Sequence, residues 1–329
     1  MAEPRRGIVL GAGGVLGAAW TMGALSALAD ADAGVGFEGS SADVVVGTSA
    51  GSVLASFIAR GVDTETLARH QRGTAEPGDP AVDYDYDAAG PLPPSPRWGT
   101  IGSRRLLAAT ARRPHRIPPA AALSAMLPVG RGSLEPIGKL VQGRDGTEPS
   151  WPTSPQLWIV ATDFETGRRT VFGADGAPEA TVSEAVMASC AIPAWYRPMV
   201  IGGRRYIDGG TCSATSADLL ARQHLDEVYV LAPMASFELD CPSSALARIE
   251  RQLRRATTRR LLREADKLRA VGTTVTMLAP GPEDLEAIGA NMMDPRRRFE
   301  VFETSLRTSA RSLREAGTPA KHQGLPAAG

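Results

Sequence analysis

Apolar residues along this chain form short runs of strand length that alternate with longer segments of helical pattern. This alternation predicts a largely parallel sheet with helices on both of its faces. No apolar run reaches the roughly 20 residues that a membrane span needs. The predicted strands are residues 6–10, 43–46, 156–163, 227–232 and 273–278. The predicted helices are residues 18–29, 53–60, 104–113, 117–127, 182–188, 217–224, 243–271 and 297–314.

The most informative pattern is a serine between two glycines at the end of a predicted strand. Gly47, Ser49 and Gly51 form G-x-S-x-G, with strand residues before them and helical residues after them. A serine on a tight strand-to-helix turn has an exposed hydroxyl, and small neighbours let the two elements approach closely. The helix start directs free N–H groups to the same place. We predict a nucleophilic Ser49; the alternative is an ordinary strand-to-helix turn.

A second glycine-rich segment follows the first predicted strand and is expected to be a turn. Gly11, Gly13 and Gly17 give G-x-G-x-x-x-G, one residue longer than the dinucleotide-binding pattern, and the acidic residue expected on a second strand is not evident. The other interpretation is an oxyanion hole, in which backbone N–H groups without obstructing side chains stabilise a developing negative charge. The serine motif favours the oxyanion hole.

A third pattern lies far downstream, where Asp208, Gly209 and Gly210 end another short strand. Considered alone, an aspartate beside glycines is typical of a turn. A Ser-acid-His triad is the rival arrangement for the serine. None of the four histidines follows a strand in a short loop, as that triad requires, so we interpret them as surface residues: His70, His115, His224 and His322.

Taken together, these patterns resemble the patatin-like phospholipases, in which a glycine-rich loop, G-x-S-x-G and D-G-G or D-G-A occur in this order. Two further segments are similar to that family: 161–167 (ATDFETG) and 189–198 (SCAIPAWYRP). The resemblance covers roughly residues 6–221. It implies a patatin-like three-layer α/β sandwich with a largely parallel central sheet.

The resemblance also implies an activity, namely hydrolysis of lipid esters such as phospholipids, lysophospholipids or neutral acyl esters. Ser49 would attack the acyl carbonyl, Asp208 would accept its proton, and the N–H groups of Gly13, Gly14 and Val15 would hold the oxyanion. A carboxylate is a weaker base than imidazole, so Asp208 must lie within hydrogen-bond reach of the serine. The alternative is a catalytically silent member that binds acyl ligands or a protein partner.

The chain departs from the family pattern beside the oxyanion loop. Leu16 stands where the family usually carries arginine or lysine, and Ala12 precedes Gly13 and Gly14 where three consecutive glycines are common. Both changes keep the backbone N–H donors, and the change at Leu16 removes a cation. The residues after Gly210 also differ, and they help to shape the pocket in the family.

Composition predicts a cytoplasmic enzyme, peripheral at a membrane in one interpretation, and says little about partners. Lys+Arg and Asp+Glu are balanced at 36 each, which gives no global field toward nucleic acid. The three cysteines match no metal spacing and no disulfide framework, as is usual in a reducing compartment. We therefore expect no cofactor and no metal. The substrate is expected to be a lipid or acyl ester, and oligomeric state is not readable.

The expected organisation is a catalytic domain at 6–221, a C-terminal strand and helices at 222–317, and a disordered tail at 318–329. Residues 73–102 are rich in proline, glycine and aspartate and are expected to be a surface loop or a lid. The predicted helix 243–271 carries an arginine-rich face, for which two interpretations remain open. One is a solvated helix side, and the other is a surface that rests on anionic headgroups.

Overall fold

The computed structural model describes residues 3–33, 35–80, 94–97, 99–143, 145–238 and 245–317. The strands are β1 (Arg6–Leu10), β2 (Val44–Thr48), β3 (Gln156–Asp163), β4 (Arg169–Phe172), β5 (Met199–Ile201), β6 (Arg204–Asp208), β7 (Glu227–Leu231) and β8 (Thr274–Leu278). The α-helices are α1 (Gly14–Ala29), α2 (Ala50–Ile58), α3 (Thr64–Arg72), α5 (Arg104–Arg112), α6 (Pro119–Met126), α7 (Glu135–Gln142), α8 (Val182–Ser189), α9 (Ala245–Arg269), α10 (Pro282–Ile288) and α11 (Arg298–Gly317).

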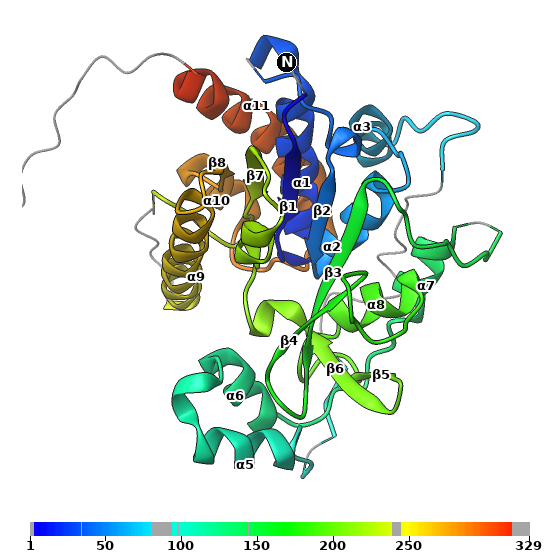
Figure 1. Cartoon of the computed structure of the whole chain (residues 1–329), viewed down its shortest axis with the longest axis vertical. Helices are drawn as coiled ribbons and strands as arrows, with labels where there is room; N and C mark the ends of the chain where they lie inside the picture. The colour runs from blue at the N-terminus through cyan, green and yellow to red at the C-terminus, as the bar shows by residue number, and fades with distance from the viewer. Residues whose placement is uncertain are drawn as a thin grey trace, which may run out of the picture.

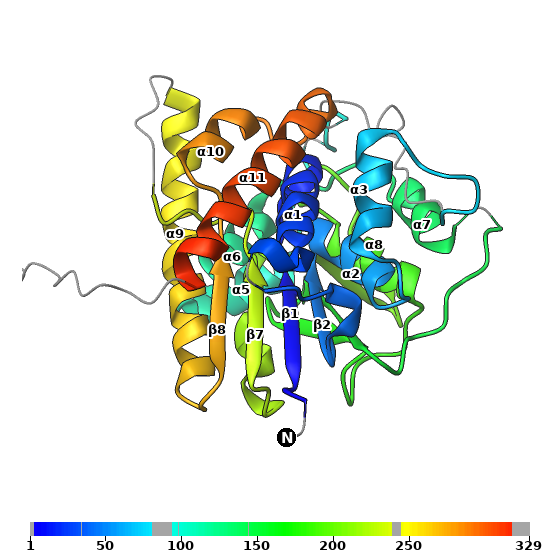
Figure 2. The ribbon, with the colours of Figure 1, turned by 90° about the horizontal axis from the view of Figure 1, so that it is seen from above.

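All eight strands belong to one sheet with the order β5-β6-β3-β2-β1-β7-β8, to which β4 adds along β3. Strands β1, β2, β3, β7 and β8 pair in parallel, whereas β4 and β6 are antiparallel to β3. Figure 2 shows β8, β7, β1 and β2 side by side, with β1 inside the sheet. The predicted fold class, a largely parallel sheet between helical layers, is confirmed.

Alternate residues of the central strands point into two separate cores, because side chains along a strand alternate between faces. Ile8 and Leu10 of β1 pack with α1, α2, α8 and α11, whereas Val9 packs with α9 and the 3-10 helix Ala217–Arg222. Figure 1 shows α9 on one side of the sheet and α2, α3 and α8 on the other. The sheet therefore separates two apolar cores, one under each helical layer.

Helix bounds differ from the sequence predictions at several points. The segment from Gly11 to Gly17 is not a turn throughout, because α1 already begins at Gly14. The predicted helix at 217–224 is a 3-10 helix that ends at Arg222, and His224 follows it with a φ of 51°. Helices α3, α7 and α10 were not predicted; all three are short, and α3 has only two apolar residues, Leu67 and Ala68.

The arginine-rich face of α9 is not uniformly solvated, so both interpretations of it are wrong for two of its arginines. Arg251 and Arg254 are 5% and 0% exposed. The Arg254 guanidinium donates to the carbonyls of Pro233 (2.6 Å) and Ala235 (3.2 Å) and pairs with Glu250 (2.5 Å). A buried charge needs such partners, and α9 is thereby fixed to the segment after β7.

Two sequence expectations concern residues outside the described ranges. Nearly half of the predicted lid (81–93 and 98 within 73–102) and the whole tail 318–329 lie outside the described residues. In the part of the chain that is described, no helix has both the length and the apolarity to cross a bilayer. The lid and the domain division stay predictions.

Candidate active site

Ser49 stands at a strained strand-to-helix turn between β2 and α2. Its φ of 53° and ψ of −125° lie in a region that side-chain-bearing residues rarely adopt, and this costs about 1–3 kcal/mol. The Ser49 N–H donates to Ser189 Oγ (2.8 Å), and the Ser189 hydroxyl donates to the Val160 carbonyl (2.6 Å). Ser189, on α8, thus ties the turn to β3 and holds the Ser49 backbone in this conformation.

Asp208 reaches Ser49 because two strands meet end to end along one edge of β3. Thr48, the last residue of β2, pairs with Val160, and Asp208, the last residue of β6, pairs with Ala161. Val160 and Ala161 both pair with β4 on the opposite edge of β3, so β2 and β6 must occupy the same remaining edge. Because β2 runs parallel to β3 and β6 runs antiparallel, their carboxyl ends point toward each other.

Gly209 allows this junction to be as tight as it is. A Cβ atom at Gly209 would lie 2.2 Å from the Val160 carbonyl oxygen and 3.0 Å from Thr48 Cγ2. Gly210 donates its N–H to Asp208 Oδ1 (2.7 Å). The two glycines of the third sequence pattern therefore serve different purposes, since one permits close approach and the other orients the carboxylate.

The environment of Asp208 changes its acidity. The residue is 7% exposed, and burial raises the pKa of its carboxyl to about 6, against hydrogen bonds from the Ser49 hydroxyl and the Gly210 N–H that favour the ionised form. A carboxylate with this pKa is still largely ionised at neutral pH, and it is a stronger base than an ordinary aspartate. The pair of Ser49 and Asp208 is therefore chemically suited to nucleophilic attack.

This pKa sets an expected pH dependence. Protonated Asp208 cannot accept the serine proton, so kcat/KM should decline as the pH falls through about 6, approaching tenfold per pH unit below it. A pH–rate profile on a neutral, soluble ester measures this. A rate that stays constant down to pH 4 would contradict a catalytic carboxylate with a raised pKa.

The amides of the glycine-rich segment are available at the start of α1. None of the described residues accepts a hydrogen bond from the backbone N–H groups of Gly13, Gly14 or Val15, whereas the next N–H, that of Leu16, donates to the Met292 carbonyl (2.9 Å). Gly14 has a φ of +59°, which glycine adopts without strain. Such free N–H groups at a helix N-terminus favour a negative charge.

The remaining motif glycines surround the same junction. Gly11 donates to the Leu231 carbonyl (2.9 Å), and the amide of Ala12 donates to the Ala214 carbonyl (2.8 Å). These two bonds connect the segment before α1 to β7 and to the loop after Gly210. Gly17 lies in the first turn of α1, Gly47 lies in β2, and Gly51 lies in the first turn of α2.

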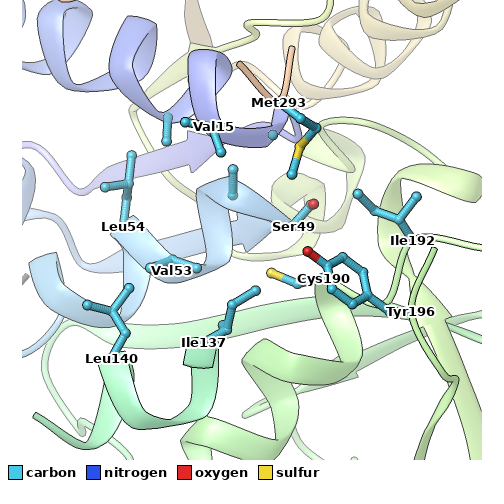
Figure 3. A pocket seen from close by; sticks show the side chains of 13 residues that line it. Val15, Ser49, Val53, Leu54, Ile137, Leu140, Cys190, Ile192, Tyr196 and Met293 are labelled. Carbon is cyan, nitrogen blue, oxygen red and sulfur yellow. The ribbon is translucent and has the colours of Figure 1, made fainter. Parts of the chain in front are cut away.

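An apolar pocket of about 100 Å³ opens beside Ser49 (Figure 3). Figure 3 shows side chains from several separate elements directed toward it, with the Ser49 and Tyr196 hydroxyls on the same side. The polar groups among its side chains are these two hydroxyls and the Cys190 thiol. The lining residues are Gly14, Val15, Ala18, Ser49, Ala50, Val53, Leu54, Ile137, Leu140, Cys190, Ile192, Tyr196 and Met293.

Most of these lining residues were not predicted from sequence. Ile137 and Leu140 lie on α7, an unpredicted helix, and Met293 lies on the loop after α10, far along the chain. No local signal marks them, because apolar residues at helical spacing look like any core-facing pattern. Cys190 is a neutral pocket residue, since burial and the nearby Asp208 raise the pKa of its thiol.

Helix α9 contacts the loop after Asp208 through Glu264, which is 2% exposed. Its carboxylate accepts hydrogen bonds from the hydroxyls of Ser213 (2.6 Å) and Thr215 (2.7 Å) and from the Ala217 N–H (3.0 Å). These residues flank Ala214, whose carbonyl receives the Ala12 N–H. The loop after Asp208 and the loop before α1 are therefore held together by a helix that sequence analysis did not connect with the site.

The histidines lie elsewhere. None of the three histidines within the described ranges, His70, His115 and His224, lines the pocket beside Ser49. His115 and His224 are exposed as predicted, whereas His70 is buried, so its interpretation as a surface residue is wrong. The same described ranges hold no group of three or more His, Cys, Asp or Glu side chains that could bind a metal ion. The chemistry that this arrangement can perform is acyl transfer, with a hydroxyl, a neighbouring carboxylate, free amides and an apolar pocket.

Comparison with known proteins gives one family match. The model of the family described as patatin-like phospholipase matches residues 8–221. Among solved structures, the type III effector protein ExoU is 18% identical with a TM-score of 0.38. The match covers 96% of this chain and 54% of the ExoU chain. VipD from Legionella pneumophila is 11% identical with a TM-score of 0.42, covering 96% of this chain and 67% of its own. This chain thus spans about half the length of the ExoU chain.

Proposed function

Because this chain belongs to the patatin-like phospholipase family, we propose that it is a serine hydrolase of lipid esters that uses Ser49 and Asp208 as its catalytic pair. The observation that carries the proposal is the meeting of β2 and β6 along β3. That meeting brings the buried Asp208 carboxyl beside Ser49, whose hydroxyl favours the ionised form of the carboxyl, next to an apolar pocket. A lipid acyl chain gains roughly 0.8 kcal/mol for each methylene that leaves water.

In the proposed reaction, Ser49 Oγ forms a bond to the acyl carbonyl carbon while Asp208 accepts the hydroxyl proton. The carbonyl oxygen becomes negatively charged, and the free N–H groups of Gly13, Gly14 and Val15 stabilise it. The intermediate collapses, the carbon–oxygen bond to the alcohol breaks, and Asp208 returns the proton to the leaving oxygen. Water then attacks the acyl–Ser49 ester by the same steps in reverse, which releases the fatty acid.

The absence of a cation at position 16 does not remove an essential part of this scheme. Leu16 is fully buried in the main core, and its N–H is already bonded to the Met292 carbonyl. The three preceding N–H groups are the ones free to bind an oxyanion. Met293 lines the pocket near this point, and the carbonyl of the preceding Met292 accepts the Leu16 N–H.

A fluorophosphonate probe tests the proposal directly, because it reacts only with an activated serine. Wild-type protein should become labelled on Ser49, as located by peptide mass spectrometry, and denatured protein should not. Labelling should disappear in Ser49→Ala. If folded wild-type protein is not labelled, the catalytically silent, acyl-binding alternative replaces the enzyme.

We expect hydrolysis of soluble short-chain esters to be independent of added metal ions. The nucleophile, the base and the oxyanion donors are all supplied by protein groups in this proposal, so no step requires a Lewis acid. The measurement compares p-nitrophenyl butyrate turnover before and after dialysis against a chelator. A loss of turnover that calcium restores would contradict the expected mechanism.

A further inference from the structure

The charges of this protein are unevenly distributed. Over the whole chain 36 basic residues balance 36 acidic ones, yet the stretch from residue 88 to 134 contains no aspartate or glutamate. It contains seven arginines, at positions 97, 104, 105, 112, 113, 116 and 131. We call the described part of this stretch, residues 94–97 and 99–134, the α5–α6 segment. A strongly basic segment in a neutral protein indicates an anionic partner.

The arginine side chains of the α5–α6 segment are open to solvent. The six whose exposure is described, Arg97, Arg104, Arg105, Arg112, Arg113 and Arg131, are all exposed. None of these six forms an ion pair with a described residue; the paired arginines of the neighbouring strand β6 are Arg204 with Asp163 and Arg205 with Glu165. Their charges are thus not neutralised within the described protein.

Helix α6 adds an apolar surface to these charges. Its exposed positions, Pro119, Ala120, Leu123 and Met126, follow helical spacing and are all apolar. Leu123 is 59% exposed and Met126 is 65% exposed, so the outer face of α6 has large side chains in water. The inner face packs on Leu106 of α5 in a small satellite core. A nucleic acid would offer this apolar face no partner, whereas a lipid surface would.

The α5–α6 segment is connected to the pocket beside Ser49. The chain after α6 runs along the loop that follows α8: Gly132 bridges to Tyr196 in parallel, and the Gly132 N–H donates to the Trp195 carbonyl (2.9 Å). Tyr196 lines the pocket, and the chain then enters α7, which lines it with Ile137 and Leu140. Figure 1 shows α5 and α6 projecting beyond the sheet at the end where β4 and β6 lie.

Helix α9 is the other arginine-rich element, but it is less suited to contact an anionic lipid surface beside the pocket. Arg251 and Arg254 are buried, and α9 packs on the sheet face opposite to the pocket helices α2 and α8. Its exposed arginines include Arg255, Arg259 and Arg263, and they are accompanied by exposed Asp266. They therefore provide a matched control, because they are equally basic but lie on another face.

We propose that the α5–α6 segment is the surface by which this protein docks on an anionic lipid bilayer. Its arginines contact headgroup phosphates, while Leu123 and Met126 enter the acyl boundary. The choice of a bilayer rests on the proposed function, because a docked α6 brings the adjoining pocket to the membrane. Substrate lipid can then reach Ser49 without crossing bulk water.

The test measures binding separately from catalysis, in a Ser49→Ala background. Full-length protein is sedimented with phosphatidylcholine vesicles that contain or lack phosphatidylglycerol, at low and at high salt. We expect binding only to the anionic vesicles and a strong decrease with salt. Replacing Arg104 and Arg105 with glutamine should weaken binding about fivefold per arginine. Leu123→Ser with Met126→Ser should weaken it at both salt concentrations.

The control variant carries Arg255→Gln, Arg259→Gln and Arg263→Gln and should bind like the parent. Equal weakening in the control, or unchanged binding in the α5–α6 variants, would overturn the proposal. Binding to duplex DNA as tight as binding to anionic vesicles, and insensitive to the Leu123 and Met126 changes, would also overturn it. Soluble-ester turnover in the wild-type background should be unchanged by the α5–α6 substitutions; that readout keeps failure of docking distinct from failure of the proposed catalysis.

Discussion

Ester hydrolysis is expected to fall to background when Ser49 is replaced by alanine, a loss on the order of 10⁴–10⁶-fold in kcat. The reason is that the hydroxyl is the only group proposed to bond to the substrate, so no other residue can substitute for it. The measurement is p-nitrophenyl ester turnover by protein whose melting curve matches the wild type. Substantial turnover by such a folded variant would remove Ser49 from the mechanism.

Ser49→Gly serves as a matched partner for this variant. Alanine keeps the backbone strain that the φ of 53° imposes, whereas glycine relieves it. Both variants should be inactive. The free energy of unfolding of Ser49→Gly should exceed that of Ser49→Ala by about 1 kcal/mol, because the relief of strain outweighs the greater entropy that glycine gives the unfolded chain. Equal stability of the two would indicate that the turn is relaxed in solution.

Asp208→Asn is expected to lower kcat by roughly 10²–10⁴-fold, because an amide cannot accept the serine proton. The suitable control is Asp163→Asn, which changes another buried aspartate at a strand end, 3% exposed, next to neither Ser49 nor the pocket. The control should retain most of its turnover. His70→Ala and His224→Ala should likewise retain it, and a histidine variant as damaged as Asp208→Asn would favour a triad.

Asp208→Asn should lower activity but raise the free energy of unfolding at neutral and higher pH. The folded-state pKa of Asp208 is raised from 3.8 to about 6, so its ionised form destabilises the fold. Below about pH 4 the carboxyl is protonated and does not destabilise the fold. As the pH rises from about 4 through 6, its ionisation lowers the free energy of unfolding by up to about 3 kcal/mol. Asp208→Asn should therefore unfold less readily than wild type at pH 8, with the difference vanishing near pH 4. Denaturant unfolding at the two pH values measures this.

Local patterns were sufficient for the elements that repeat apolar residues over their whole length. Strands β1 and β3 begin and end where the sequence predicts, because each contains an uninterrupted apolar run, at 8–10 and 157–161, within a short segment of strand character. The strand, turn and helix around Ser49 were predicted for the same reason, although α2 begins three residues earlier. Helix α7 was missed because it is only eight residues long, and only its packing on α8 and its place at the pocket reveal its purpose.

The sequence by itself determined the class of fold, the family and the three segments that contain the proposed catalytic groups, because each depends on residues adjacent in the chain. Only the tertiary structure decided how those segments meet. The end-to-end approach of β2 and β6, the raised pKa of Asp208, the burial of Arg254 and the place of Met293 in the pocket all arise from contacts between residues far apart in sequence. Burial and electrostatics depend on everything that surrounds a group, and no local pattern contains that information.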